Sequence, residues 1–332
     1  MKVYIITRFG ICQSLESFYE REIVYLENFL AKSINVQKKY ITKWIILIDI
    51  NTPHYICEKI KKLAPPDLLH IHIHDPFLEK ATRPNIKKVF QNIGVKANDK
   101  IIEIRIDADD VFSNDYIINV LNVLKKSNFV RKYEKVLIDT PEGMYFYPSK
   151  KKFIRVRKKN YSIQALYSIF NQNFFSSYDY GHQKLENRVI ESGGYCYNLD
   201  NKPFWVRTMR HYTISQFGKT TSIFDGRFIL IKQIVKEIFF NNLTNKMIYK
   251  NEIRLSDISG RFQFSNKIID KLKKHEQAVK KYNFKFSSKL KKIINNKSIK
   301  SAFVLKKVLL DMYCSEQSER KKSEIVKDFY SF

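Results

Sequence analysis

The chain has 332 residues, of which 44% are hydrophobic and 14% aromatic, and this composition excludes a disordered or low-complexity protein. Lys and Arg number 60 against 33 Asp and Glu, so the net charge of +27 indicates an anionic partner, such as nucleic acid, anionic lipid or a polyanionic substrate. The four cysteines are far apart and form no Cys-x-x-Cys pair, which disfavours a disulfide or zinc framework.

Strands and helices alternate over the first 110 residues, and apolar residues mark each of them. We predict strands at 2–7, 43–49, 68–74 and 100–106, and helices at 14–30, 53–63 and 83–92. The run 43–49 is almost continuously apolar, as in a parallel sheet that is covered on both faces. A helix capped by Ser113 follows the fourth strand. These β–α units with short connections predict a doubly wound α/β sheet, whose ligands bind beyond the carboxyl ends of the strands.

The pattern changes after residue 130. Shorter strands are expected at 135–139, 144–148 and 152–157, and residues 161–200 mix a short helix, a polar loop and a strand at 195–199. Residues 226–330 show helical patterns separated by polar turns. We therefore expect an α/β domain over residues 1–225 and a basic, mainly helical extension over 226–332.

Three carboxylates follow the fourth predicted strand directly. Asp107, Asp109 and Asp110 lie within four positions, where their mutual repulsion is costly unless a cation neutralises it. Hard oxygen ligands at Asp107 and Asp109 suit Mg²⁺ or Mn²⁺, which can also bridge to phosphate oxygens. Asp110 could complete the ligand shell through water, anchor the end of the strand, or cap the next helix. The pattern favours a metal–diphosphate site, and the alternative is a solvated acidic turn.

Other polar residues lie at the same predicted edge of the sheet. Thr7 and Arg8 end the first strand and Asp49 ends the second, where they could contact a nucleotide base or ribose or could be turn residues. Arg105 alternates with isoleucines, so it projects to one face of the fourth strand, where a phosphate or an acidic neighbour would suit its planar guanidinium. Arg83 precedes a helix and could reach a diphosphate or remain a surface residue.

Three of these segments together resemble a known family. Ile6-Thr-Arg-Phe9, Arg105-Ile-Asp-Ala-Asp-Asp110, and Trp205 with His211 downstream are similar to the rhamnosyltransferase-like family of GT-A-fold glycosyltransferases, over about residues 1–217. The resemblance implies a GT-A-like doubly wound mixed sheet, with residues 1–225 as a nucleotide-sugar-binding and catalytic domain. It also implies a nucleotide-diphosphate sugar as donor, with rhamnose as a candidate sugar, Mn²⁺ or Mg²⁺ as cofactor, and a glycan or polysaccharide as acceptor.

The resemblance also implies roles for single residues. The first acidic position, Asp107, is expected to face the ribose or sugar of the donor as well as the metal. A downstream histidine, His211, is expected to complete the metal shell, and the alternative is a structural histidine. His182 lies in a polar loop and could contact the acceptor or a phosphate of the donor.

Inverting transfer, which we expect here, needs a carboxylate base near the acceptor hydroxyl. The candidates are Asp179, Glu142 and Glu186. We favour Asp179, because its loop Ser177-Tyr-Asp-Tyr-Gly181 carries aromatic residues that could support a sugar ring. Glu142 fits a turn equally well.

Two other classes of protein stay open at this point. A nucleic-acid-binding protein would explain the charge together with 20 Tyr and 25 Phe, but we find no zinc finger or aromatic RNA-binding strand motif and expect no specific nucleic-acid partner. A nucleotidyltransferase could use the same acidic cluster. It would need a Gly-rich phosphate loop, and Arg8-Phe-Gly-Ile11 has a single glycine.

The basic excess is densest near the C-terminus. Residues 230–332 carry +14 of the net charge, and 271–300 hold 11 Lys against one acidic residue, Glu276. Apolar residues lie among these lysines, so we expect a helix on an anionic membrane surface, and the alternative is a solvated face in a Lys-rich chain. No apolar run reaches about 18 residues and no signal peptide is recognisable. We expect a cytoplasmic protein that can be peripheral at the inner membrane face and act on a lipid-linked saccharide.

Overall fold

The computed structural model describes residues 1–11, 16–74, 84–148, 151–158, 163–199, 202–209, 252–258 and 260–275. The chain divides into two compact units. The first comprises Met1–Phe146, Phe153–Thr208 and Ile253–Ile268, and the second comprises Tyr147–Lys152, Met209–Glu252 and Ile269–Phe332. In the second unit, Lys151 forms an ion pair with Asp270. The described residues of the candidate active site all lie in the first unit.

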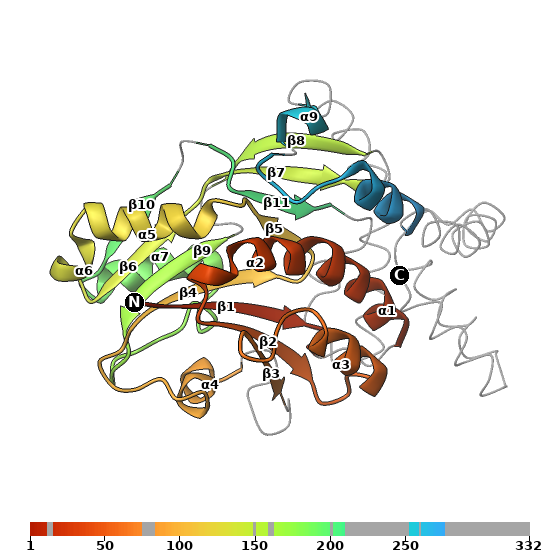
Figure 1. The fold of residues 1–332 in the computed structure, drawn as a ribbon. Helices are drawn as coiled ribbons and strands as arrows, with labels where there is room; N and C mark the ends of the chain where they lie inside the picture. Colours follow the sequence, from red (N-terminus) through yellow and green to blue (C-terminus); the bar gives the residue numbers. More distant parts are fainter. Residues whose placement is uncertain are drawn as a thin grey trace, which may run out of the picture. The chain divides into compact units, whose positions relative to one another are not determined.

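A mixed sheet of seven strands forms the centre of the first unit (Figure 1). Its order is β10 (Tyr195–Asn198), β6 (Lys135–Asp139), β9 (Gln164–Ile169), β4 (Lys100–Asp107), β1 (Lys2–Phe9), β2 (Lys43–Asp49) and β3 (Leu69–His74). Strands β1 to β4 are parallel, β10 is parallel to β6, and β9 runs antiparallel to both of its neighbours. The carboxyl ends of β1 to β4 therefore meet at one edge of the sheet.

Helices cover both faces of this sheet. One face packs against α1 (Glu16–Tyr25), α2 (Ala31–Gln37), α3 (His54–Lys61) and α5 (Tyr116–Lys126), and the other packs against α4 (Ile86–Asn92) and α7 (His182–Glu191). The helix predicted at 14–30 continues to Gln37 through a π-helical turn at Leu26–Leu30. The predicted doubly wound mixed α/β sheet is confirmed.

A second sheet follows the acidic cluster in sequence. Its order is β12 (Glu252–Ile253), β8 (Lys152–Arg157), β7 (Glu142–Tyr147), β11 (Trp205–Thr208) and β5 (Asp110–Phe112). Trp205 is fully buried, and its Nε1 donates to the carbonyl oxygen of Thr140 at 2.6 Å. A Cβ on Gly143 would lie 2.0 Å from the Trp205 ring, so the close approach of β7 and β11 requires glycine there. This packing fixes β11 beside β5.

Part of the predicted C-terminal extension belongs to the first unit. Phe262 and Phe264 are buried, and Phe264 lies 5.0 Å from Phe29 and 5.1 Å from Phe153 between ring centroids. The side chain of Arg261 donates to the carbonyl oxygen of Pro203 at 2.6 Å. The expected boundary at residues 225 and 226 lies outside the described residues. In the described part of the chain, no helix is both long and apolar enough to cross a membrane.

Candidate active site

The register of β1 and β4 brings the first charged pair together. In this parallel pair Arg8 lies opposite Asp107, at the carboxyl end of both strands. Nη2 of Arg8 lies 3.6 Å from Oδ1 of Asp107. This contact is an ion pair longer than a hydrogen bond, and both side chains are about one-third exposed, at 35% and 30%.

The second sheet brings another arginine to the same carboxylate. Strand β11 pairs antiparallel with β5, which places Arg207 opposite Asp110. Nη2 of Arg207 lies 4.0 Å from Oδ2 of Asp107, so each carboxylate oxygen of Asp107 has a guanidinium as neighbour. The hydroxyl of Thr208 donates to the main-chain oxygen of Asp109 at 2.7 Å, which ties β11 to the acidic cluster.

The charge state of Asp107 follows from these neighbours. Burial alone would raise its pKa, but the nearby guanidiniums of Arg8, Arg207 and Arg105 outweigh that cost and hold the pKa of Asp107 well below its usual range. Asp107 is therefore a carboxylate at any physiological pH. A negative charge is fixed at the carboxyl end of β4, and positive charges surround it.

Arg105 is a buried cation on the same face of β4 as Asp107. Its Nη1 donates to the carbonyl oxygens of Ser177 and Tyr180, at 3.2 Å each. Its guanidinium lies 4.5 Å from the ring centroid of Tyr178, and the Arg8 guanidinium lies 5.5 Å from the same centroid. The Tyr178 hydroxyl donates to the carbonyl oxygen of Ile6 at 2.9 Å. One buried tyrosine thus supports two arginines of the site.

His182 joins this cluster from the start of α7. Its Nδ1 lies 3.0 Å from Oε1 of Gln164, whose Nε2 lies 3.2 Å from Oδ1 of Asp139. The side-chain nitrogen of Gln164 donates to Asp139, so the side-chain oxygen of Gln164 accepts a hydrogen bond from His182. The imidazole proton of His182 therefore lies on Nδ1. Burial and the charge of Arg105 lower the pKa of His182 to about 3, so the ring is neutral. The unprotonated nitrogen is then Nε2.

Glu103 and Asp179 hold the segment that carries Tyr178. Glu103 is fully buried in β4, and its Oε1 accepts hydrogen bonds from the hydroxyls of Ser176 and Ser177 and from the Ser177 main-chain nitrogen. Oδ2 of Asp179 accepts from the Ser176 main-chain nitrogen at 2.8 Å. Asp179 therefore stabilises the turn in which it lies. Its role as catalytic base stays a prediction.

Three other predicted residues make local contacts. The hydroxyl of Thr7 is buried and accepts from Nε1 of Trp44 at 3.1 Å. Oδ1 of Asp49 accepts from the main-chain nitrogen and the side-chain amide of Asn51, at 2.9 Å each, and so closes the turn after β2. Glu142 is buried in the second sheet and forms ion pairs with two arginines, at 3.2 Å and 2.9 Å.

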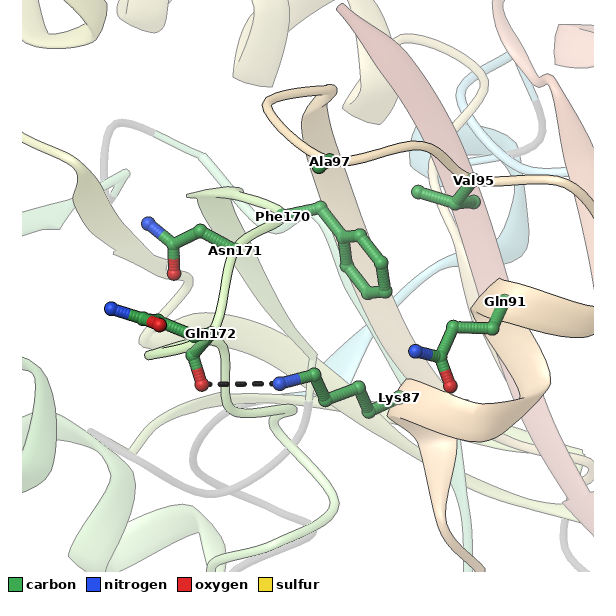
Figure 2. A pocket seen from close by; sticks show the side chains of 7 residues that line it. All are labelled: Lys87, Gln91, Val95, Ala97, Phe170, Asn171 and Gln172. Atoms are coloured by element: carbon green, nitrogen blue, oxygen red, sulfur yellow. Dashed lines mark hydrogen bonds between the residues drawn. The ribbon is translucent and has the colours of Figure 1, made fainter.

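A pocket at the other end of the sheet contains none of the predicted residues. It is lined by side chains of α4, of the loop before β4 and of the segment after β9 (Figure 2): Lys87, Gln91, Val95, Ala97, Phe170, Asn171 and Gln172. Nζ of Lys87 donates to the carbonyl oxygen of Gln172 at 3.1 Å across it. It lies at the amino end of β4, whereas Asp107 lies at the carboxyl end.

A sequence comparison identifies the family of the chain. Residues 17–220 match the family described as "Putative rhamnosyl transferase". The chain belongs to this family. It is a glycosyltransferase. This match confirms the family resemblance that was inferred from the sequence motifs. A comparison with curated proteins gave no match.

Solved structures similar to the glycosyltransferase are distant from it. The inositol-1-phosphate CTP transferase of T. maritima is 12% identical, with 62% of this chain and 89% of that chain covered and a TM-score of 0.35. Residues 1–349 of S. aureus TarS are 12% identical, with 71% and 65% covered and a TM-score of 0.34. Yersinia pseudotuberculosis HddC is 13% identical, with 62% and 93% covered and a TM-score of 0.33. These likenesses are too weak to assign a substrate or a residue.

The glycosyltransferase offers two carboxylates that fit a divalent cation by their chemistry. Asp107 and Asp109 are hard oxygen donors two positions apart, and Mg²⁺ in proteins is often held by one or two carboxylates together with phosphate oxygens of the substrate. The described residues hold no group of three or more His, Cys, Asp or Glu side chains arranged for a metal ion. His211, the third predicted ligand, and Arg83 lie outside the described residues.

The structure brings Arg8, Arg105, Asp107 and His182 together, as residues at one edge of the sheet. Sequence reasoning missed Arg207, although it lies two positions after Trp205 in a segment that had been singled out. Its strand, β11, has only four residues and was not predicted. Its residues, Trp-Val-Arg-Thr, show no alternation of apolar and polar side chains, and its position depends on pairing with β5 and β7.

Proposed function

We propose that this glycosyltransferase transfers a sugar, with rhamnose as the first candidate, from a nucleoside-diphosphate donor to a saccharide acceptor. The observation that carries the proposal is the ionised Asp107, which lies at the carboxyl end of the central strands with Arg8 and Arg207 as neighbours. Ligands of doubly wound sheets bind at this edge, and a diphosphate needs cationic neighbours there. The family match supports the transfer of a sugar.

The proposed cofactor is Mg²⁺ or Mn²⁺. Asp107 and Asp109 would hold it, with His211 as a further candidate ligand. When bound, such a cation acts as a Lewis acid on the diphosphate and lowers the cost of its departure. The pKa of Asp107 lies far below its usual range, so this ligand needs no deprotonation before it binds a cation.

In the proposed inverting reaction, an acceptor hydroxyl oxygen attacks the anomeric carbon while the bond from that carbon to the diphosphate oxygen breaks. The bonding electron pair leaves with the diphosphate, and the hydroxyl proton passes to a base of the protein. Asp179 and Glu142 are the predicted bases. Of these, Glu142 is engaged by two arginines in the second sheet, whereas Asp179 lies in the segment that contacts Arg105. Asp179 is therefore the first variant to test.

The proposed acceptor is a glycan or a lipid-linked saccharide. An acceptor of the second kind would be reached from an anionic membrane surface, and the basic residues 276–332 would contribute to that contact. They lie outside the described residues, so this part of the proposal rests on the charge pattern of the sequence alone.

A screen of nucleotide sugars tests the proposal. The full-length protein is incubated with single UDP-, GDP- and dTDP-linked sugars, with Mg²⁺, Mn²⁺ or EDTA, and both its melting temperature and the release of nucleoside diphosphate are measured. We expect one donor class to raise the melting temperature and to be slowly hydrolysed, and EDTA to abolish the hydrolysis. If no nucleotide sugar has either effect with any cation, the proposal is wrong.

A further inference from the structure

Several guanidiniums lie near His182. Arg105, Arg207 and Arg8 all act on its charge state, together with the carboxylate of Asp107. Guanidiniums gathered at one site attract anions. The guanidinium is also the side chain whose planar, forked donors match phosphate oxygens.

Two of these arginines are accessible from solvent. The side chain of Arg8 is 35% exposed and that of Arg207 is 17% exposed, whereas Arg105 is buried. Their contacts with Asp107, at 3.6 and 4.0 Å, are ion pairs longer than hydrogen bonds. Such contacts are readily exchanged for shorter, charge-assisted hydrogen bonds to another anion.

The cations are also held in place before any ligand arrives. The Tyr178 ring supports Arg8 and Arg105, and its hydroxyl is fastened to the carbonyl oxygen of Ile6. The main chain of Arg207 is fixed because β11 is paired on both sides, and its guanidinium lies beside Asp107. Donors that are already oriented cost no reorganisation when negative charge develops on a leaving group.

We propose that Arg8 and Arg207 bind the diphosphate of the donor, and that Asp107 is the internal counter-ion that these two arginines give up when the donor binds. This inference rests on the proposed function for the identity of the anion as a nucleoside diphosphate. Arg105 and Tyr178 are positioning residues, which act through Arg8. The place of Arg207 beside Asp107 carries the inference.

The proposed arginine site is tested by isothermal titration calorimetry of the full-length protein with inorganic pyrophosphate, UDP, GDP and dTDP. Each titration is carried out in EDTA and in Mg²⁺. Arg207→Gln and Arg8→Gln should each weaken pyrophosphate and nucleoside diphosphate binding by about 10- to 100-fold in both buffers, because each removes charge-assisted hydrogen bonds. Arg131→Gln, an exposed change in α6 (Phe129–Lys132) with the same loss of charge, should bind as the wild type does. Thermal melts establish that each variant is folded.

Asp107→Asn provides the decisive comparison. In EDTA, loss of the negative charge of Asp107 should strengthen pyrophosphate binding by about 10-fold, since one anion that competes for both guanidiniums is removed. In Mg²⁺ the same variant should bind nucleoside diphosphate more weakly than the wild type does, if Asp107 also holds the cation. Weaker binding of pyrophosphate by Asp107→Asn in EDTA would contradict the counter-ion role.

The outcomes separate this inference from the proposed function. If the wild type binds a nucleoside diphosphate and both arginine variants bind it equally well, the arginine site is wrong and the proposed function stands. If the wild type binds pyrophosphate through these arginines but no nucleoside diphosphate in either buffer, the proposed donor class is wrong and the anion site stands. If the wild type binds neither pyrophosphate nor any nucleoside diphosphate, both are wrong.

Discussion

Asp107 owes its low pKa to arginines from three different strands. Arg8 comes from β1, Arg105 from β4 itself and Arg207 from β11 of the second sheet. The motif around Asp107 could be read from the sequence as an acidic cluster at a strand end. Its neighbours could be predicted only in part, because Arg207 reaches it through a strand that the sequence does not signal.

Asp109 is the position where the proposed cation site can be tested with little change to the fold. Asp109→Asn should lower kcat/KM by more than about 100-fold, because loss of one carboxylate ligand removes several kcal/mol of electrostatic stabilisation. The bond from Thr208 uses the main-chain oxygen of Asp109 and is kept in the variant. Donor turnover is measured with Mg²⁺ or Mn²⁺ beside a melting curve. The control is Asp257→Asn, at an exposed position of α9 (Leu255–Ile258). Turnover of Asp109→Asn at the wild-type level would contradict the assignment of Asp109 as a metal ligand.

Glu103 makes the stability of the protein depend on pH. Burial raises its pKa from 4.5 to about 7, so the folded state binds a proton that the unfolded state has already released. Stability therefore declines as pH rises from about 4.5 through 7, because folding then requires either a buried charge or uptake of a proton. Glu103→Gln keeps an oxygen for Ser176 and Ser177 and cannot ionise.

We expect Glu103→Gln to be more stable than the wild type at pH 8, by an amount on the order of 3 kcal/mol, and to differ much less at pH 5. The measurement is denaturant unfolding of both proteins at several pH values between 5 and 8. A difference in the free energy of unfolding that stays constant over this range would show that Glu103 is ionised in the folded state at every pH tested.

At the scale of elements, eight strands lie close to predicted ranges, namely β1 to β4, β6 to β8 and β10, whereas β5, β9, β11 and β12 were not predicted. Strands β1, β2, β3 and β4 have six to eight residues and lie within about two residues of the predicted ranges, because runs of β-branched residues mark them. Strand β9, Gln164–Ile169, was missed although it is buried at five of its six positions. Its Gln, Ala, Tyr and Ser show no alternation, since it lies between β4 and β6 with both faces covered.

The missed strands matter for the site because they carry two of its residues. Gln164, the partner of His182, begins β9, and Arg207 lies in β11. Both positions are set by pairing with strands at least 25 residues away in sequence. A pattern in the local sequence cannot encode such partners, whereas Arg8 and Asp107 could be expected together because each ends a long parallel strand.

The contact of β7 with β11 can be tested through one glycine. Gly143→Ala should lower the free energy of unfolding by about 1–3 kcal/mol, because its Cβ would overlap the buried Trp205 ring. It should also weaken donor binding, since β11 positions Arg207. Gly260→Ala, where a Cβ meets no atom within 4 Å, is the matched control and should change neither quantity. Chemical unfolding and calorimetry measure the two effects, and a variant with wild-type stability would show that β7 can move away from Trp205.

At the scale of the whole chain, the first unit extends into the region near the C-terminus where the basic residues are densest. The family match ends at residue 220, yet residues 253–268 still belong to the first unit through Phe262 and Phe264. A truncation intended to remove the basic tail must therefore leave this aromatic packing intact. Residues 276–332 begin after the last described helical residue and still hold most of the lysines of the segment 271–300.

Removal of residues 276–332 should reduce binding to anionic vesicles while turnover of a soluble acceptor is kept. Each lysine near an anionic surface contributes about 1 kcal/mol, so a segment with this many lysines should bind such vesicles measurably, and salt should weaken the binding. Co-sedimentation with vesicles of neutral or mixed anionic lipid measures the effect for the full-length and the shortened protein. Equal binding of the full-length protein to both kinds of vesicle, or to neither, would exclude an electrostatic membrane contact. The lysines would then be a solvated surface, and a lipid-linked acceptor would have to reach the site without help from this segment.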